Sequence, residues 1–154
     1  MPFRRILVPV DYSENSKTAV EAAIALAREL GGSLELIHVW DRPTYVSDGV
    51  MVRRPGEEQR SLAELIHANA EKDMDDFLAS LTLPSDVSVT HRLCSGDPAS
   101  TIIAELKQKN HDLVVLSTHG RTGLIHLLLG SVAEKLVRFS PVPVLTIPPS
   151  ERAG

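Results

Sequence analysis

The sequence predicts an α/β fold, a three-layer α/β/α sandwich built on a doubly wound, five-stranded parallel sheet. The first observation is that short β-branched segments alternate with longer segments of helical period along the chain. The second is that several of the short segments are continuously apolar, as expected for strands that helices cover on both faces. Right-handed crossovers between successive strands then predict the strand order 3-2-1-4-5.

Each element has its own local signal. The first helix is expected over residues 13–30, where a pair of glycines ends it, and the second over 59–81. The third opens at Asp97 and Pro98, because aspartate is a good N-cap and proline fits the first helical position. The strands are expected at residues 5–10, 34–39, 87–93, 113–117 and 142–147.

Residues 41–58 fit this alternation poorly, because they hold Pro43, Gly49, Pro55 and Gly56 and show no regular period. A loop of this length is usually a functional lid or a mobile segment. We expect a mobile surface loop here. The remainder is expected to form one domain over residues 1–150, with a short tail at 151–154.

Composition limits the classes of partner. The 154 residues carry a formal net charge of −4, so the basic footprint of a protein that binds nucleic acid or an anionic membrane is missing. The single cysteine, Cys94, excludes an internal disulfide framework and fits a reducing compartment. The apolar run at residues 6–10 is too short for a signal segment or a membrane span. The expected location is cytoplasmic, with no nucleic-acid or membrane partner.

The segment from Ser117 to Ser131 is the most informative for function. It follows the fourth expected strand and leads into the last helix, where Ser131 and Glu134 have the spacing of a capping box with Ser131 as N-cap. The first N–H groups of a helix lack internal partners and lie at the positive end of its dipole. Gly120 and Gly130 allow the main chain to approach an anion closely. Together these features suit a phosphate site, but turn-forming glycines and a simple helix cap would leave the same pattern.

The predicted topology gives that segment a place. In a sheet of this order the winding reverses between the first and fourth strands, and ligands bind beyond the carboxyl ends of the strands at that point. We therefore expect the loops after Val10 and Ser117 to face each other across a crevice. The sequence contains neither a P-loop nor a G-x-G-x-x-G motif after the first strand.

The same segment resembles the ATP-binding members of the universal stress protein family. Those proteins carry Gly, two residues, Gly, nine residues, and then Gly followed by Ser or Thr, where this chain has Ser117, Gly120, Gly130 and Ser131. The runs ILVPVDYS at 6–13, THGRTG at 118–123, LLLGSVAE at 127–134 and PVPVL at 141–145 are also typical of the family. The resemblance covers nearly the whole chain. It implies a Rossmann-like fold of the adenine nucleotide α-hydrolase type.

The resemblance also implies a binding site for ATP, with Mg²⁺ carried on the phosphates and no protein metal site. It places Val10, Asp11 and Val39 beside the adenine, and Leu116 and Ser117 near the ribose. The residues that it implies for the phosphates, largely through main-chain N–H groups, are Gly120, Arg121, Gly130, Ser131 and Val132.

Several residues allow more than one interpretation. Ser117 replaces the family's first glycine, which would cost about 1 kcal/mol or more if the main chain there had positive φ, but would be only a steric matter in ordinary β conformation. Asp11 suits capping of the first helix as well as contact with adenine or ribose. Arg121 suits a bidentate phosphate contact or an exposed surface position. Cys94 is expected as a buried thiol rather than a nucleophile.

The histidines do not predict a transition-metal site, because none of the six has a partner at ligand spacing. His38 is expected to be a core residue with its hydrogen bonds satisfied. His119 suits either a phosphate contact or packing within its loop, and His126 is expected at the surface.

Three functions remain open. The first is an ATP-binding regulatory protein of the stress-response type, with slow hydrolysis at most. The second is a true ATPase or adenylyl-transferring enzyme, which the loop Asp-Tyr-Ser-Glu-Asn-Ser at residues 11–16 does not favour. The third is a dimeric module that binds no nucleotide. The strand at 142–147 is expected at a sheet edge, where apolar strands tend to pair, and the resemblance implies a homodimer through it.

Overall fold

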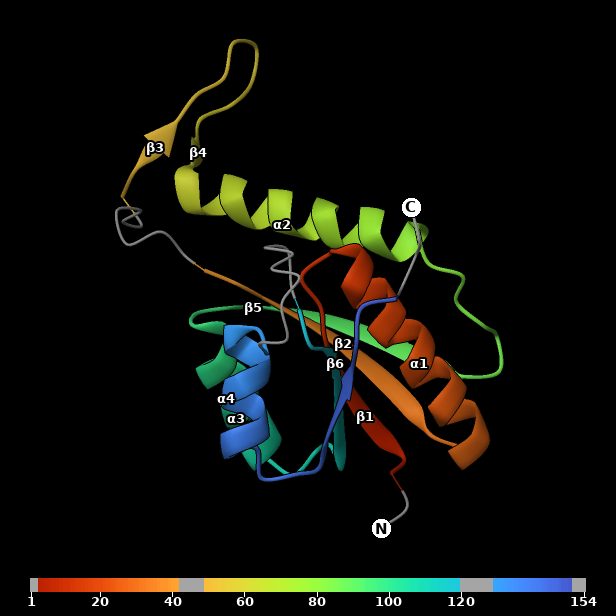
Figure 1. The fold of residues 1–154 in the computed structure, drawn as a ribbon. Coiled ribbons are helices and arrows are strands. Elements are labelled where there is room, and N and C mark those ends of the chain that lie inside the picture. The colour runs from red at the N-terminus through yellow and green to blue at the C-terminus, as the bar shows by residue number, and fades with distance from the viewer. Residues whose placement is uncertain (1–2, 42–48, 120–128, 151–154) are drawn as a thin grey trace.

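A five-stranded parallel sheet forms the centre of the molecule. The computed structural model describes residues 3–41, 49–119 and 129–150. Within them, the large sheet has the order β5-β2-β1-β6-β7, and all its neighbouring strands are parallel (Figure 1). This is the predicted order 3-2-1-4-5, so the predicted fold class and winding are confirmed. The strands are β1 (Arg5–Pro9), β2 (Ser33–Trp40), β5 (Ser88–Ser95), β6 (Leu113–Ser117) and β7 (Val144–Ile147).

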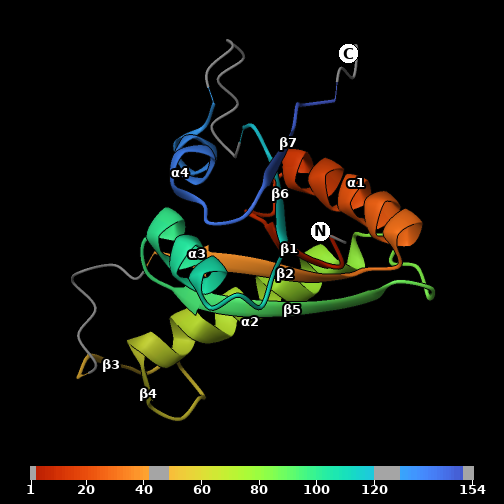
Figure 2. The ribbon, with the colours of Figure 1, turned by 90° about the horizontal axis from the view of Figure 1, so that it is seen from below.

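Helices cover both faces of this sheet, as the continuously apolar strands predicted. Side chains of β1 alternate between the two layers: Ile6 and Val8 belong to one core and Leu7 to the other, and all three are fully buried. In a parallel α/β fold each helix starts just beyond the carboxyl end of a strand. The N-termini of the helices therefore gather at one edge of the sheet. The first layer contains α1 (Glu14–Leu30) and α2 (Leu62–Ala79), and the second contains α3 (Pro98–Lys107) and α4 (Ser131–Phe139) (Figures 1 and 2).

The ends of α1 follow from its local sequence. The Ser13 hydroxyl accepts a hydrogen bond from the N–H of Ser16 at 3.1 Å, which is an N-cap. At the other end Gly31 has φ +66°, a left-handed conformation that favours glycine. Gly32 follows because of a close approach: a Cβ there would lie 2.9 Å from the carbonyl oxygen of Arg4. Gly31 thus ends the helix, and Gly32 leaves room for the main chain of Arg4.

The prediction of a plain loop over 41–58 is wrong in part. β3 (Met51–Val52) pairs with β4 (Arg60–Ser61) in an antiparallel hairpin that projects beyond the start of α2 (Figure 1). α2 begins at Leu62, not at 59, because Ser61 caps it. The Ser61 hydroxyl accepts from the Glu64 N–H at 3.1 Å, while the Glu64 carboxylate accepts from the Ser61 N–H at 3.3 Å. Residues 42–48 lie outside the described part of the chain.

The last strand is shorter than the predicted 142–147. It begins at Val144, because Pro143 has no N–H to donate to a sheet ladder. The N–H of Val142 is bonded instead to the hydroxyl of Ser140 at 3.2 Å. β7 is an edge strand, as predicted. Among the residues that the structure describes, none of the helices combines the length and apolar character needed to cross a membrane.

Candidate functional site

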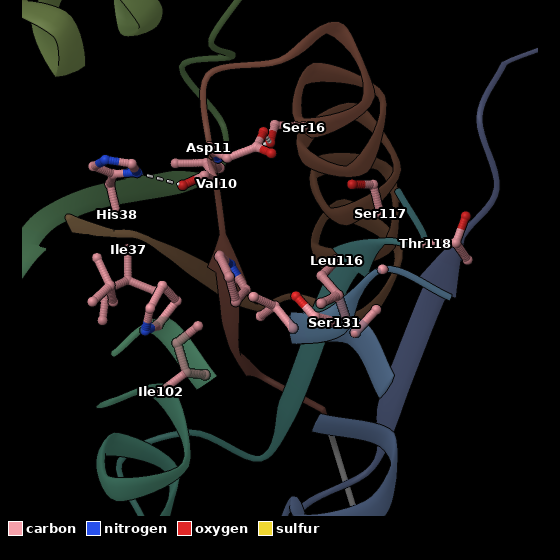
Figure 3. A pocket seen from close by; sticks show the side chains of 16 residues that line it. Val10, Asp11, Ser16, Ile37, His38, Ile102, Leu116, Ser117, Thr118 and Ser131 are labelled. Carbon is pink, nitrogen blue, oxygen red and sulfur yellow. Dashed lines mark hydrogen bonds between the residues drawn. The ribbon is translucent and has the colours of Figure 1, made fainter. Parts of the chain in front are cut away.

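A cavity of about 270 Å³ opens at the carboxyl ends of β1 and β6, where the winding of the sheet reverses. Val10 and Asp11 line it from the loop after β1, and Ser117 and Thr118 line it from the end of β6 (Figure 3). The two loops therefore face each other, which confirms the crevice predicted from the strand order. Pockets at such a reversal point are the usual ligand sites of α/β folds.

The inner walls of this pocket are apolar. Ile37 and Val39 come from β2, Ile102 from α3, and Leu116 from β6, and Figure 3 shows Ile37 and Ile102 on the same side of the pocket. All four side chains belong to the core that packs against α3 and α4, and none is more than 8 % exposed. The walls are therefore continuous with the core. They suit a flat apolar group, because moving such a group out of water lowers the free energy.

Three helices start around the pocket, and two of them are capped by their own side chains. The N-terminus of α1 is capped by Ser13, and that of α3 by Asp97, whose carboxylate accepts from the Ser100 N–H at 2.9 Å. This hydrogen bond holds the pKa of Asp97 below its ordinary value. Asp97 and Pro98 thus begin α3 as predicted.

α4 differs from the other two, and the predicted capping box at its start is wrong. Its N-cap is Gly130, no side chain caps it, and the N–H of Glu134 donates to the Gly130 carbonyl at 2.9 Å. Ser131 is therefore the first residue inside the helix. The N–H groups of residues 131–133 have no protein acceptor within the described chain, because the first N–H groups of a helix have no carbonyl one turn earlier. The hydroxyl of Ser131 likewise has no acceptor among the described residues. These donors lie at the positive end of the dipole, where anions bind.

The N–H of Gly130 itself is already used. It donates to the carbonyl of Thr118 at 2.7 Å, a bond that joins the start of α4 to the end of β6. The donors that remain for a ligand are consequently those of residues 131–133. Ser117, at the same junction, does not have positive φ: within the described residues, Tyr12 and Lys109 are the non-glycine residues that do. Serine in place of glycine at 117 therefore costs no backbone strain.

Asp11 is held in place by the two serines that follow it. Its Oδ1 accepts from the N–H and hydroxyl of Ser13, at 3.1 and 2.5 Å. It also accepts from the hydroxyl of Ser16 at 2.6 Å (Figure 3). The N-cap of α1 is Ser13, so Asp11 supports the cap instead of being the cap. Tyr12, between them, has φ +67°, an uncommon conformation for a bulky residue that marks a constrained turn.

On the side of the turn that faces α2, the ring of Tyr12 packs against the rings of His38 and Phe77. The ring of His38 lies 4.2 Å from that of Tyr12, which in turn lies 5.3 Å from the ring of Phe77 in α2. The Nδ1 of His38 is 2.7 Å from the carbonyl oxygen of Val10. Because a carbonyl only accepts, Nδ1 carries the proton in this bond. The predicted satisfied role of His38 is thus confirmed, although the residue is half-buried and lines the pocket.

Most of the residues that sequence analysis assigned to the site line this pocket. Gly120 and Arg121 lie outside the described residues, as does His126. Thr118 contacts His119 through a bond of 2.8 Å between Oγ1 and Nδ1. The assigned residues in the lining are Val10, Asp11, Val39, Leu116, Ser117, Gly130, Ser131 and Val132. Those that sequence analysis missed are Pro9, Ser16, Ile37, His38, Pro98, Ile102, Thr118 and Ala133.

Some of the missed residues had a signal in the sequence. Ile37 precedes Val39 by two positions, so both side chains point to the same face of β2. Pro98 and Ile102 lie one turn apart at the start of a helix that follows a strand, and such helices begin at the carboxyl edge. Ser16 had no comparable signal, because its contact with Asp11 depends on the turn between them.

A second group of charged residues is structural. Arg92 on β5 pairs with Glu35 on β2, at 2.8 Å, and with Glu105 on α3, while the Nε2 of His111 lies 2.8 Å from Glu35. Burial opposes the charge of Arg92, but the two carboxylates outweigh it and raise its pKa. The neighbouring Cys94 is half-buried, not buried as predicted, and this partial burial raises the pKa of its thiol, which does not favour a nucleophile. Among the described residues no three acidic, His or Cys side chains are grouped so as to hold a metal ion.

Comparison with known proteins agrees with this fold. The model of the universal stress protein family matches residues 2–148. A universal stress protein from Methanocaldococcus jannaschii is 30% identical over 148 residues, covering 94% of this chain and 82% of its own length.

Solved structures give the same result. The universal stress protein UspA from Lactobacillus plantarum superposes with a TM-score of 0.67 and 26% identity, covering 94% of this chain and 97% of its own. A family protein from Arabidopsis thaliana, solved with AMP bound, has a TM-score of 0.59 and 19% identity over 97% of this chain and 94% of its own, a likeness of fold. The chain belongs to the universal stress protein family.

Proposed function

We propose that this chain is an ATP-binding regulatory protein of the stress-response type, with the nucleotide in the pocket between β1 and β6. The observation that carries the proposal is the start of α4. Of the three helix N-termini around the pocket, those of α1 and α3 are capped by side chains, and that of α4 is not. An anion that enters the pocket has one set of helix N–H donors open to it.

The rest of the pocket fits a nucleoside. The adenine is expected beside Val10, Asp11 and Val39, against the apolar walls, and the ribose beside Leu116 and Ser117. The cavity, at about 270 Å³, is close to the lower end of the usual range for ligand pockets, roughly 300–1,000 Å³. With the nucleoside against these walls, the phosphates are expected at the start of α4. AMP bound to the Arabidopsis family protein supports a ligand of this class.

The phosphates are expected on the N–H groups of residues 131–133 and on the Ser131 hydroxyl. Gly120 and Arg121 are proposed to contribute on the strength of the motif alone. Mg²⁺ would be carried on the phosphate oxygens, because this ion keeps most of its waters and is usually bound through substrate phosphates.

Mass spectrometry of nucleotide released from the denatured, purified protein tests the ligand directly. Isothermal titration with adenosine, AMP, ATP and GMP then separates the parts of the site. We expect affinity to rise from adenosine to its phosphates, because only the phosphates reach α4, and to fall for GMP. If neither method detects an adenine ligand, the alternative of a module that binds no nucleotide replaces this proposal.

We also propose a homodimer through the strand predicted at residues 142–147. β7 is an edge strand, and its Leu145 is 39% exposed. Val137 and Phe139 of α4, which packs against β7, are also exposed. Light scattering at micromolar concentration should give the mass of two chains for the parent and of one chain for Leu145→Lys. A parent that is monomeric would contradict the proposal.

A further inference from the structure

We propose that Ser117 is a positioning residue, whose hydroxyl holds the N-terminus of α4 in the orientation that receives a phosphate. The inference rests on the proposed function. Ser117 stands at the position where the ATP-binding pattern of the family has its first glycine.

The first step is a hydrogen bond within the chain. The Ser117 hydroxyl donates to the carbonyl of His119, two residues on, at 2.8 Å. Serine hydroxyls that bond the main chain at this spacing stabilise tight turns. The bond fixes the peptide units on both sides of Thr118, which a glycine at 117 has no atom to do.

The second step is that this turn is tied to two other elements. The N–H of Thr118 donates to the carbonyl of Ile147, at the end of β7, at 3.0 Å. The carbonyl of Thr118 accepts from the N–H of Gly130, the N-cap of α4, at 2.7 Å. The two peptide units that flank Thr118 therefore join the end of β7 to the start of α4, and the Ser117 hydroxyl, by bonding the His119 carbonyl, holds both units in place.

The hydrogen bond of the Ser117 hydroxyl also distinguishes a positioning role from direct contact with a phosphate. The Ser117 proton is already donated to His119, so toward a ligand the hydroxyl retains acceptor capacity only. An acceptor does not attract a phosphate. If the hydroxyl acts through α4, its removal weakens ligands that carry a phosphate and leaves adenosine unaffected. If the side chain instead packs against the nucleoside, both ligands weaken together.

The chain offers a matched control at the other end of α4. Ser140 donates its hydroxyl to the carbonyl of Val142, again two residues on, at 2.7 Å. Ser140→Ala removes a bond of the same kind outside the pocket lining, together with the bond that this hydroxyl accepts from the Val142 N–H, so it is at least as disruptive locally as Ser117→Ala. Ser117→Thr keeps the hydroxyl at 117, so it is expected to retain the parent's behaviour.

Titration calorimetry of these variants with adenosine and AMP tests the proposal. For Ser117→Ala we expect AMP affinity roughly two- to tenfold lower, the value of one net hydrogen bond, and unchanged adenosine affinity. Ser117→Thr and Ser140→Ala should match the parent for both ligands. Equal AMP affinity in Ser117→Ala and parent, or an equal loss for adenosine and AMP, overturns the proposal.

A ligand-free measurement keeps this test independent of the proposed function. Amide hydrogen exchange by NMR reports the bond between the Gly130 N–H and the Thr118 carbonyl. Exchange at Gly130 should be faster in Ser117→Ala than in the parent and unchanged in Ser140→Ala. If no adenine ligand binds the parent, the proposed function fails, and unaltered Gly130 exchange would separately show that Ser117 does not hold α4.

Discussion

Replacing Ser131 by aspartate separates the binding of phosphate from the stability of the fold. Ser131 is the first residue inside α4, is exposed, and lines the pocket. The substitution places a carboxylate at the helix end where the N–H groups of residues 131–133 are open. That charge should stabilise the helix by itself and should repel a second anion from the same place.

Both effects have a calculable size. A carboxylate in the first turn of an exposed helix contributes about 0.3–1 kcal/mol. In a domain of this length that raises Tm by roughly 1–4 °C. Two unit charges about 5 Å apart repel by roughly 1–3 kcal/mol for effective dielectric constants between about 80 and 20. AMP should therefore bind Ser131→Asp roughly fivefold to a hundredfold more weakly than the parent.

Calorimetric titration with AMP and a thermal unfolding scan measure the two quantities on one preparation. Ser131→Asn is the control, because asparagine has nearly the same shape as aspartate and carries no charge. Its affinity for AMP should lie within a small factor of that of Ser131→Ala, which removes the hydroxyl alone. The reasoning is refuted if Ser131→Asp binds AMP as the parent does. It is equally refuted if that variant is less stable than Ser131→Asn, since the helix would then not begin where the structure places it.

Three further changes test the packing on which the site depends. Leu136 of α4 is fully buried, so Leu136→Ala should lower the free energy of unfolding, measured in urea, by about 2–5 kcal/mol. Val137 is half exposed, so Val137→Ala should change it by less than about 0.5 kcal/mol. Similar losses in the two variants would mean that α4 does not pack on the core through Leu136. Gly32→Ala should destabilise by about 1–3 kcal/mol, because its Cβ would lie 2.9 Å from a carbonyl oxygen, while Gly49→Ala, with open space around it, should match the parent. Asp97 has a lowered pKa, so its stabilising effect is present above the pKa of the unfolded carboxyl and is lost as pH falls through the lower folded value. Acid titration of Asp97→Asn should therefore show a smaller loss of stability below about pH 4, and an unchanged acid transition would argue against that hydrogen bond.

The fold could be predicted because its signals are local. Each strand is marked in the sequence by a short β-branched run. Each helix is marked by apolar residues at helical spacing, with an N-cap such as Asp97 at its start or a C-cap such as Gly31 at its end. Handedness rules then leave one simple winding, and the winding fixes where the pocket opens. That winding brings the loops after Val10 and Ser117 to one crevice, whereas the assignment of Leu116 to the site came from the family resemblance.

The start of α4 shows where local signals fail. Gly130 and Ser131 are both acceptable N-caps, and the spacing to Glu134 favours Ser131. The structure places the cap at Gly130, whose N–H is bonded to Thr118, twelve positions earlier in the sequence. A contact between the end of a strand and the start of a helix decided the boundary, and so decided which donors remain for a ligand.

By itself, the sequence determined the class of fold, the strand order and the edge of the sheet at which a ligand would bind. The hydrophobic period identifies each helix and strand from neighbouring residues, and the general preference for right-handed crossovers then orders the strands. Only the tertiary structure decided which N–H groups are open, that Asp11 supports a cap formed by Ser13, and that His111 pairs with Glu35, 76 positions away. The arrangement at Asp11 depends on the turn at Tyr12, and the other two depend on hydrogen bonds between groups that are distant in sequence. Such a bond forms only when packing has already brought both partners within about 3 Å.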